Sequence, residues 1–351
     1  MLKKLLFIGC FLSLFSSLNA QTTLSAGDMA IVGLNYDSVP YEMAIVNLVP
    51  ISSGTVIRIT DYAYDEATST FSTVSTANTS EGSIQWTTTS ALAAGTVTKF
   101  TINAASGTPV VSGLPGTVTV IGWTNTVTTA CPSAAGGDNW FIFQGPNATT
   151  VTTYVFAWCN PFALTHNSIP QVAGQFLVSG SGLSNIFNSY LPPSLTLGTN
   201  AISLSRDPAS AGYHGDDNIY IGTKTGNKSS LITAISTISN WNHNETTSYD
   251  INPGGTNFPG SNPIFTIPLG IEDFDISNLN FYPNPTSNIL SIKCSNIIDG
   301  IRVINILGQV MLENKTNNSN VQIDLSNLPK ASYFVKVTSE GKEKIIKVVK
   351  Q

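Results

Sequence analysis

The chain has 351 residues, of which only 11% are charged, with 16 Lys and Arg against 21 Asp and Glu. An ordinary soluble domain has about 25%. The formal net charge of -5 excludes a basic nucleic-acid footprint over the chain as a whole, so no nucleic-acid partner is expected. Because 42% of the residues are hydrophobic, the chain can fill real cores, and its length predicts two or three domains rather than global disorder.

The first twenty residues have the pattern of a secretory signal peptide. Two lysines precede an apolar run from Leu5 to Phe15, and small residues follow up to Ala20. We predict that residues 1–20 direct export. The apolar run is shorter than the roughly 20 residues of a membrane span, and no later segment reaches that length, so no transmembrane segment is expected. A lipid anchor on Cys10 is the alternative.

An exported chain meets oxidising conditions, which makes its cysteines disulfide candidates. Cys131 and Cys159 lie in one aromatic-rich region and are the predicted pair. Two buried thiols are the alternative. Cys294 lies in a strand of another domain and is expected to be a free, buried thiol.

Composition divides the mature chain into two bodies and a connection. Residues 21–251 are poor in charge and rich in Thr, Ser, Asn and Gly, and we predict that they form a passenger domain. From Asn252 to Gly270, 8 of 19 residues are Pro or Gly, which predicts a linker over 252–274. Beyond that point β-branched runs return, so residues 275–351 are predicted to form a second domain.

Short strands dominate the passenger region. Their spacing predicts a sandwich rather than alternating strands and helices. Tyr154, Phe156 and Trp158 alternate and are expected to share one face. The predicted strands are 29–34, 43–49, 56–60, 84–87, 96–102, 118–123, 140–144, 153–158, 201–204 and 219–221.

Two segments have the period of an amphipathic helix instead. Apolar residues recur at i, i+3, i+4 and i+7 over 231–238 and again over 183–190. Asn227 or Ser229 is positioned to cap the later helix. The fold prediction is therefore mainly β: a large antiparallel β-sandwich with one or two short helices, followed by a small Ig-like β-sandwich.

The C-terminal body carries a series of motifs in a fixed order. A Tyr-Pro-Asn-Pro turn at 282–285 precedes the first strand, a Leu-Gly-Gln turn follows at 307–309, and the chain ends on a basic strand at 344–350. With Asp-Leu-Ser-Asn-Leu and Tyr-Phe-Val-Lys-Val between them, these motifs resemble the type A C-terminal sorting domain of the type IX secretion system.

This resemblance implies an exported protein of the Bacteroidetes that is recognised by the outer-membrane secretion machinery, loses its tail, and is released or attached to the cell surface. An Ig-like domain without a sorting role is the alternative. The residues that match the sorting motifs are Tyr282, Pro283, Asn284, Pro285, Gly308 and Tyr333.

Sequence signals of catalysis are weak. Only three histidines exist, no His-Glu-x-x-His helix or Gly-x-Ser-x-Gly elbow occurs, and no phosphate-binding loop is present. No catalytic residue is therefore predicted. The long acids that a glycosidase could use are Glu42, Glu66, Glu81 and Glu245, with nothing in the sequence to pair them.

Acidic turns make calcium the cofactor to consider. Asp61 and Asp65 lie in one such turn and Asp216 and Asp217 in another, and a hard cation prefers oxygen ligands of this kind. Neither turn has EF-hand spacing. Stabilisation of the turns by local backbone hydrogen bonds is the alternative.

Aromatic residues amid Asn, Asp and Thr indicate sugar stacking as a second possibility. Trp241, on an Asn-Trp-Asn-His loop, is expected to be exposed, and Tyr220 and Tyr62 are further ligand-binding candidates. The alternative is that the tryptophans fill the core.

The segments Ala26–Gly33, Met43–Pro50, Gly54–Asp61 and Asp217–Gly222 resemble, within 24–250, a domain of large secreted bacterial proteins that is distantly similar to the lamin-tail sandwich. That domain has no established activity. We therefore predict a non-catalytic adhesion or binding protein, with extracellular polysaccharide as the expected partner. A secreted glycosidase-like hydrolase and an architectural surface or matrix subunit are the alternatives.

Overall fold

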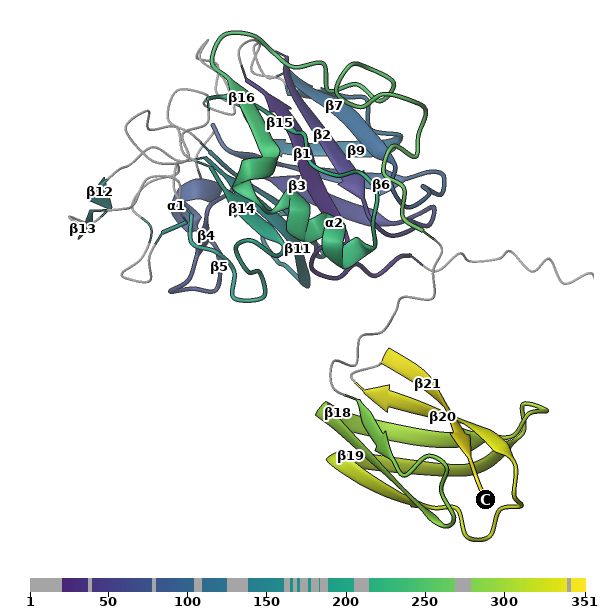
Figure 1. Cartoon of the computed structure of the whole chain (residues 1–351). Coiled ribbons are helices and arrows are strands. Elements are labelled where there is room, and N and C mark those ends of the chain that lie inside the picture. Colours follow the sequence, from purple (N-terminus) through teal and green to yellow (C-terminus); the bar gives the residue numbers. More distant parts are fainter. Residues whose placement is uncertain are drawn as a thin grey trace, which may run out of the picture. The chain divides into compact units, whose positions relative to one another are not determined.

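A computed structural model describes residues 21–36, 40–77, 80–103, 109–124, 138–160, 165–166, 169–170, 176–177, 183, 189–204, 215–268, 279–339 and 342–351. The chain divides into two compact units, which meet in sequence after Pro268 (Figure 1). The predicted signal peptide lies outside the described residues. Within the described residues, no helix is long and apolar enough to cross a membrane.

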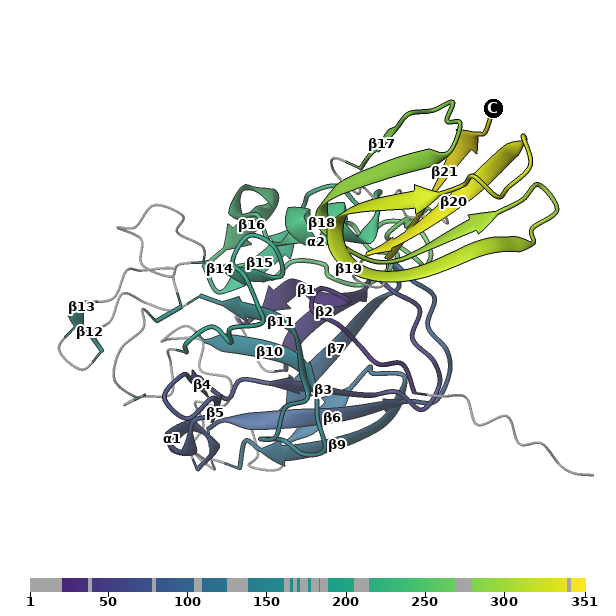
Figure 2. The same ribbon diagram turned by 90° about the horizontal axis from the view of Figure 1, so that it is seen from below.

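The first unit is a sandwich of two six-stranded sheets, which Figure 2 shows as two layers. One sheet has the order β16-β15-β1-β2-β7-β8: Trp241–Asn244, Asp217–Tyr220, Met29–Asn35, Tyr41–Asn47, Val97–Asn103 and Val110–Ser112. The other has the order β14-β11-β10-β3-β6-β9: Ala201–Ser203, Thr153–Cys159, Asn139–Gln144, Val56–Thr60, Gly82–Thr88 and Gly116–Gly122. All pairs are antiparallel except β11 with β14. A further short pair is β12 (Thr165–His166) with β13 (Ile169–Pro170).

The prediction of a mainly β fold is confirmed, and each of the ten predicted strands is present with its ends within two residues of the expected positions. The reason is that each run is long enough to span the core and ends in residues that favour turns. β1 is buried along its whole length. Its neighbours β15 and β2 cover its two edges, and apolar residues suit both of its faces because both are buried.

A bulge in β11 corrects the predicted alternation. Ile142 of β10 pairs with Phe156, and the next residue, Phe143, pairs with Tyr154, so Val155 is an extra residue. Phe156 and Trp158 therefore pack in the core between the sheets, whereas Tyr154 packs on the outer face. A shift of one residue moves a side chain to the other face of a sheet.

The outer face of the second sheet carries its own aromatic core. Phe71 lies at its centre, on β5 (Thr70–Phe71), which pairs with β4 (Tyr64–Asp65) and precedes the short helix α1 (Thr73–Thr76). Its ring contacts Phe141, Phe143 and Tyr154 with centroids 5.7, 5.3 and 6.1 Å away. This second core covers the β10 and β11 part of the outer face.

Helix α2 (Lys228–Ile235) packs on the sandwich core through Leu231, Ile232 and Ile235, and a 3₁₀ turn at Ile238–Asn240 follows it. The prediction of this helix is confirmed, and its cap is Asn227, whose side chain accepts from Ser230 N at 2.8 Å. Residues 184–188 of the other predicted helix lie outside the described residues.

The predicted linker is corrected over 252–268, which belongs to the first unit. Phe258 and Phe265 are buried in the sandwich core, and Phe265 stacks on Tyr220 with centroids 6.0 Å apart. The amide of Asn262 accepts from Val97 N at 2.9 Å and donates to Val97 O at 2.8 Å. Proline and glycine end regular structure, but two phenylalanines keep this irregular segment on the core.

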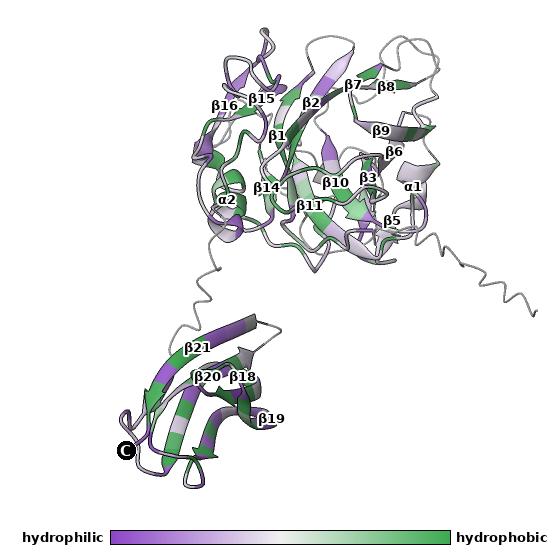
Figure 3. Ribbon diagram, turned by 90° about the vertical axis from the view of Figure 1, so that its right-hand side faces the viewer, coloured by the Kyte–Doolittle hydropathy of each residue, from purple (hydrophilic) through white to green (hydrophobic). Residues whose placement is uncertain are grey.

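The second unit is a small β domain built around two long strands. β18 (Ile289–Ile304) pairs with β19 (Val310–Asp324) along its length, with β17 (Asn280–Tyr282) at one end and with β20 (Ser332–Ser339) at the other. β20 pairs with β21 (Lys342–Val349), and buried side chains alternate with more exposed ones along both strands, which carry hydrophobic and hydrophilic residues (Figure 3). Register shifts between Lys293 and Gly300 interrupt the pairing of β18 with β19. Both parts of β18 contribute to one core.

Replacing Phe265 by Ala is expected to lower the free energy of unfolding of the first unit by about 3 to 5 kcal/mol, because the change removes a buried aromatic ring. All five tryptophans lie in this unit, so tryptophan fluorescence during urea unfolding of residues 21–351 measures it selectively. Ser261→Ala, at an exposed position of the same segment, is the control. Equal stability of the two variants would contradict the packing of Phe265 on the core.

Candidate functional site

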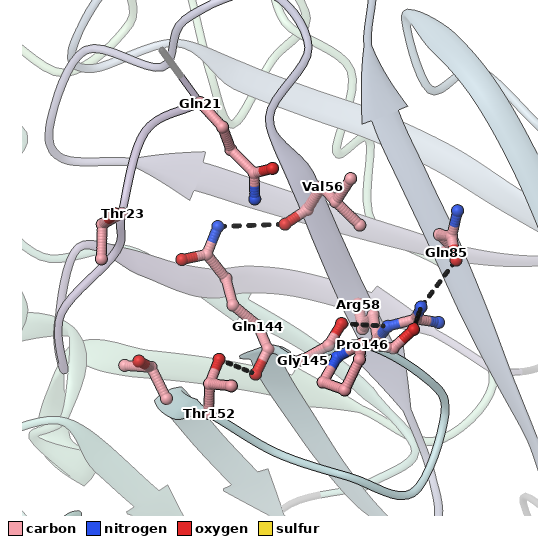
Figure 4. Close-up of a pocket in the computed structure, with 10 residues that line it drawn as sticks. Gln21, Thr23, Val56, Arg58, Gln85, Gln144, Gly145, Pro146 and Thr152 are labelled. Carbon is pink, nitrogen blue, oxygen red and sulfur yellow. Dashed lines mark hydrogen bonds between the residues drawn. The ribbon is translucent and has the colours of Figure 1, made fainter.

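A polar pocket of about 630 Å³ opens beside the second sheet of the first unit (Figure 4). Ligand pockets generally measure about 300 to 1,000 Å³. Strands β3, β6, β10 and β11, the N-terminal segment and the hairpin between β10 and β11 contribute its walls. The lining residues are Gln21, Thr23, Val56, Arg58, Gln85, Gln144, Gly145, Pro146, Thr152 and Thr153.

Arg58 is the charged residue of this lining, and it is only 3% exposed. Its Nε donates to Gly145 O at 2.9 Å, and its Nη2 donates to Pro146 O at 2.9 Å and to Gln85 Oε1 at 2.7 Å (Figure 4). All three acceptors are neutral. Burial lowers the pKa of Arg58 from its usual value because desolvation penalises the charged form.

Gln144 holds two walls of the pocket together. Its Nε2 donates to Thr22 O and to Val56 O, both at 3.0 Å, and its Oε1 accepts from Leu24 N at 2.8 Å. The amide therefore ties the N-terminal segment to β3 from its position at the end of β10. Such fixed walls mean that the pocket is formed before any ligand arrives.

A second cluster consists of three carboxyl groups at one end of the second sheet. Asp61 follows β3, Glu81 precedes β6 and Asp138 precedes β10, and antiparallel pairing brings these three points together. Their exposures are 0%, 4% and 4%. From the sequence, Asp61 and Glu81 were candidates for two different sites. The structure places them in one cluster, together with Asp138.

Hydrogen bonds position Asp61 within this cluster. Its Oδ1 accepts from Gly82 N at 2.6 Å, its Oδ2 accepts from Trp123 Nε1 at 2.7 Å, and its carbonyl accepts from Asn139 Nδ2 at 2.8 Å. Glu81 accepts from Ser75 Oγ at 3.2 Å. Hydrogen bonds therefore fix the positions of these carboxyl groups.

Burial dominates the electrostatics of the cluster. It raises the pKa of Asp61 to about 7, although the bonds from Gly82 and Trp123 lower it. Burial and repulsion by Asp61 raise the pKa of Glu81 and of Asp138 well above their usual values. Carboxyl groups in such surroundings keep their protons to a higher pH than exposed ones do.

Trp123 makes this end of the sheet geometrically unusual. Its φ is 48°, a left-handed conformation that bulky residues rarely adopt. The ring lies against Gly82, where an added Cβ would also lie 2.7 Å from Ile121 O. The bond to Asp61 and the bond from Trp123 N to Glu81 O at 2.9 Å hold this conformation in place.

The aromatic ligand candidates of the sequence prove to be core residues. Trp241 is 4% exposed and its Nε1 donates to Ile235 O at 2.7 Å, which corrects the expectation of an exposed indole. Tyr220 and Tyr62 are 0% and 3% exposed. Trp241 begins β16, which pairs with β15, so its ring packs against Tyr220 instead of facing solvent.

The acidic turns have structural partners. Asp65 Oδ1 accepts from Ala67 N at 3.0 Å, and Asp217 Oδ1 accepts from Tyr36 N at 2.7 Å. Asp216 is buried beside Asp217. Across the part of the chain that the structure describes, no three His, Cys, Asp or Glu side chains are grouped to hold a metal ion. Calcium binding stays a prediction.

Cys159 is a free, buried thiol whose Sγ lies 3.0 Å from Ser203 Oγ, and burial raises its pKa. This corrects the predicted disulfide between Cys159 and Cys131, the second of which lies outside the described residues. Cys294 is free and buried, which confirms the expectation for it.

The sorting motifs of the second unit occupy two different surroundings. Asn284 accepts from Val349 N at 2.9 Å and donates to Lys347 O at 3.0 Å, so the Tyr282–Pro285 turn is fastened to β21. Tyr333 is buried and donates to Pro329 O at 2.8 Å. Gly308, with a φ of 81°, forms an exposed turn beside Leu307, which is 78% exposed.

Comparison with known proteins identifies the second unit. Residues 280–351 match the family described as secretion system C-terminal sorting domain. The tail is thus a sorting domain of the type IX secretion system, as the sequence motifs predict. It indicates a protein that is secreted or attached to the cell surface and that uses the type IX machinery.

One curated relative is the ulvan lyase NLR42 of Nonlabens ulvanivorans, which is 33% identical over 73 residues. The match covers 20% of this chain and only 14% of that protein. A stretch of this length is close to that of the sorting domain and far shorter than the first unit. The likeness shows a shared segment and not a shared enzyme.

Sequence reasoning missed Arg58 and Asp138. Arg58 had a usable signal, because it is the basic residue of an otherwise apolar strand core, between Ile57 and Ile59. Asp138 had none, because it joins Asp61 and Glu81 only through the pairing of distant strands.

The first unit is expected to lose stability as the pH rises from about 4 to 7. The folded cluster keeps protons that the unfolded chain releases near pH 4, so its contribution is complete below that pH and is lost as the pH passes the folded pKa values. The loss should exceed about 1 kcal/mol, because a tenfold change in proton affinity corresponds to about 1.4 kcal/mol.

Urea unfolding followed by tryptophan fluorescence at a series of pH values measures this dependence. Glu81→Gln should flatten it, since the variant removes one acid and its repulsion of Asp61. Glu245→Gln, an exposed acid of the same unit, is the matched control and should leave it unchanged. Stability that rises over this range in the native chain would refute the protonated cluster.

Proposed function

We propose that this protein is an extracellular, non-catalytic binding protein whose first unit binds a glycan in the polar pocket beside the second sheet. The observation that carries the proposal is the lining itself, which combines amide, hydroxyl and guanidinium groups on fixed walls. Sugars are recognised by hydrogen bonds to such groups. Export through the type IX system delivers the unit to the medium or the cell surface, where polysaccharides are met.

The buried aromatics change the mode of recognition that is proposed. All five tryptophans are at most 4% exposed, so stacking on an exposed indole is not the basis of binding. Hydrogen bonding within the pocket takes its place. The similarity to an ulvan lyase gives no independent support, because it covers too little of either chain.

A secreted hydrolase is the second candidate, and the carboxyl cluster favours it. Asp61, Glu81 and Asp138 are three acids with raised pKa values, and such groups are used as general acids in glycoside hydrolysis. Their burial favours a structural role instead, and none of them lines the polar pocket. The two candidates differ in whether bound polysaccharide is cleaved.

Residues 21–351 are expected to bind at least one polysaccharide of a panel without releasing reducing ends. Affinity electrophoresis measures binding, and a reducing-sugar assay of the same samples measures cleavage. Thr153→Phe should weaken binding about tenfold or more by filling the pocket. Thr101→Phe, at a half-buried position of the other sheet, should bind like the native chain.

Cleavage that Asp138→Asn abolishes would establish the hydrolase instead. Binding that Thr153→Phe leaves unchanged would place the glycan site elsewhere.

Deletion of residues 280–351 is expected to abolish release or surface display in a host that has the type IX system. Gly308→Val should reduce export in part, because a β-branched residue is strained at a φ of 81°. Ser261→Ala, in the first unit, is the control. Immunoblots of medium, cell-surface and periplasmic fractions report the outcome, and normal export of the deletion variant would contradict a sorting role.

A further inference from the structure

The charge of the polar pocket identifies a narrower class of ligand. Its lining contains Arg58 and no Asp, Glu or Lys. Among the described residues, Arg58 forms no ion pair, since all of its hydrogen bonds end on neutral oxygens. A cation that is 3% exposed normally has an anionic partner, because neutral acceptors offset desolvation less well than a charge does.

The hydrogen-bonding capacity of Arg58 is also incomplete. A guanidinium has five N–H donors. One on Nε and two on Nη2 are used, whereas Nη1 is buried and has no partner among the described residues. Unsatisfied buried donors are costly, so a group that accepts from Nη1 would stabilise the site.

The position of Arg58 in the sheet explains why its side chain lines the pocket. Along one register of the outer face, Thr119, Gln85, Arg58, Phe143 and Tyr154 follow one another across five strands. The two aromatics belong to the covered part of the face and the first two residues to the polar part. Arg58 therefore lies where the second core ends and the pocket begins.

We propose that the pocket binds an oxyanion, the carboxylate or sulfate group of an acidic glycan, and that Arg58 supplies the positive charge that holds it. This inference rests on the proposed glycan-binding function and adds the charge of the ligand. A guanidinium suits both groups because it stays charged, and the N–H groups of Nη1 are the donors of Arg58 that remain for their oxygens.

Binding of residues 21–351 to dextran, polygalacturonate and dextran sulfate tests the proposal, since these chains are neutral, carboxylated and sulfated respectively. At least one acidic chain should bind about tenfold or more tightly than dextran, and added salt should weaken that binding. Free glucuronate and inorganic sulfate as competitors then separate the two sources of the oxyanion.

Arg58→Gln should reduce acidic binding to the level of dextran, but it also removes bonds that fix Gly145 and Pro146. Thr23→Glu therefore provides a second variant, because it adds a negative charge at an exposed lining position. Its matched control is Thr117→Glu, exposed on β9 outside the lining. Thr23→Glu should weaken acidic binding about tenfold, and Thr117→Glu should not.

The outcomes separate this inference from the proposed function. Equal affinity for neutral and acidic chains, reduced by Thr153→Phe, would overturn the oxyanion and keep the glycan pocket. Acidic binding that Thr23→Glu and Thr117→Glu affect alike would place the anion outside the pocket and also overturn it. Absence of binding to every chain, neutral or acidic, would overturn the proposed function itself.

Discussion

Burial on both faces of β10 and β11 is the constraint on which the rest of the first unit depends. Trp140 and Ile142 face the core between the sheets, while Phe141 and Phe143 face the second core outside. The second sheet is therefore the middle layer of a three-layer arrangement over part of its width. Apolar burial of this extent is the main stabilising contribution in a chain with few charged residues.

The same constraint determines where the unit can recognise a ligand. The aromatic side chains pack in the two cores, so Trp241, Tyr220 and Tyr62 have no exposed ring on which a sugar could stack. The outer face becomes polar only beyond Arg58, towards β6 and β9. A cation at that boundary is desolvated by its apolar neighbours and still lines the pocket, which is a combination that favours an anionic ligand.

The carboxyl cluster and the sorting domain illustrate two ways of placing polar groups. Asp61 is held in place by donors from Gly82 and Trp123, and burial raises its pKa to about 7. In the second unit the Leu307–Gly308 turn is exposed, while Asn284 fastens the opening turn to the last strand. We expect the first arrangement to make stability depend on pH, whereas the second leaves an exposed turn accessible to another protein.

The sequence by itself determined the strands, the α2 helix and the sorting domain, because these depend on local periodicity, on turn residues and on contiguous motifs, and it left the helix cap open between Asn227 and Ser229. It could not show that Val155 is a bulge, that Phe258 and Phe265 hold the Pro- and Gly-rich segment on the core, or that Trp241 is buried. Only the tertiary structure decided these points. It also joined Asp138 to Asp61 and set Arg58 beside neutral oxygens, because both depend on strand pairings between residues far apart in the chain.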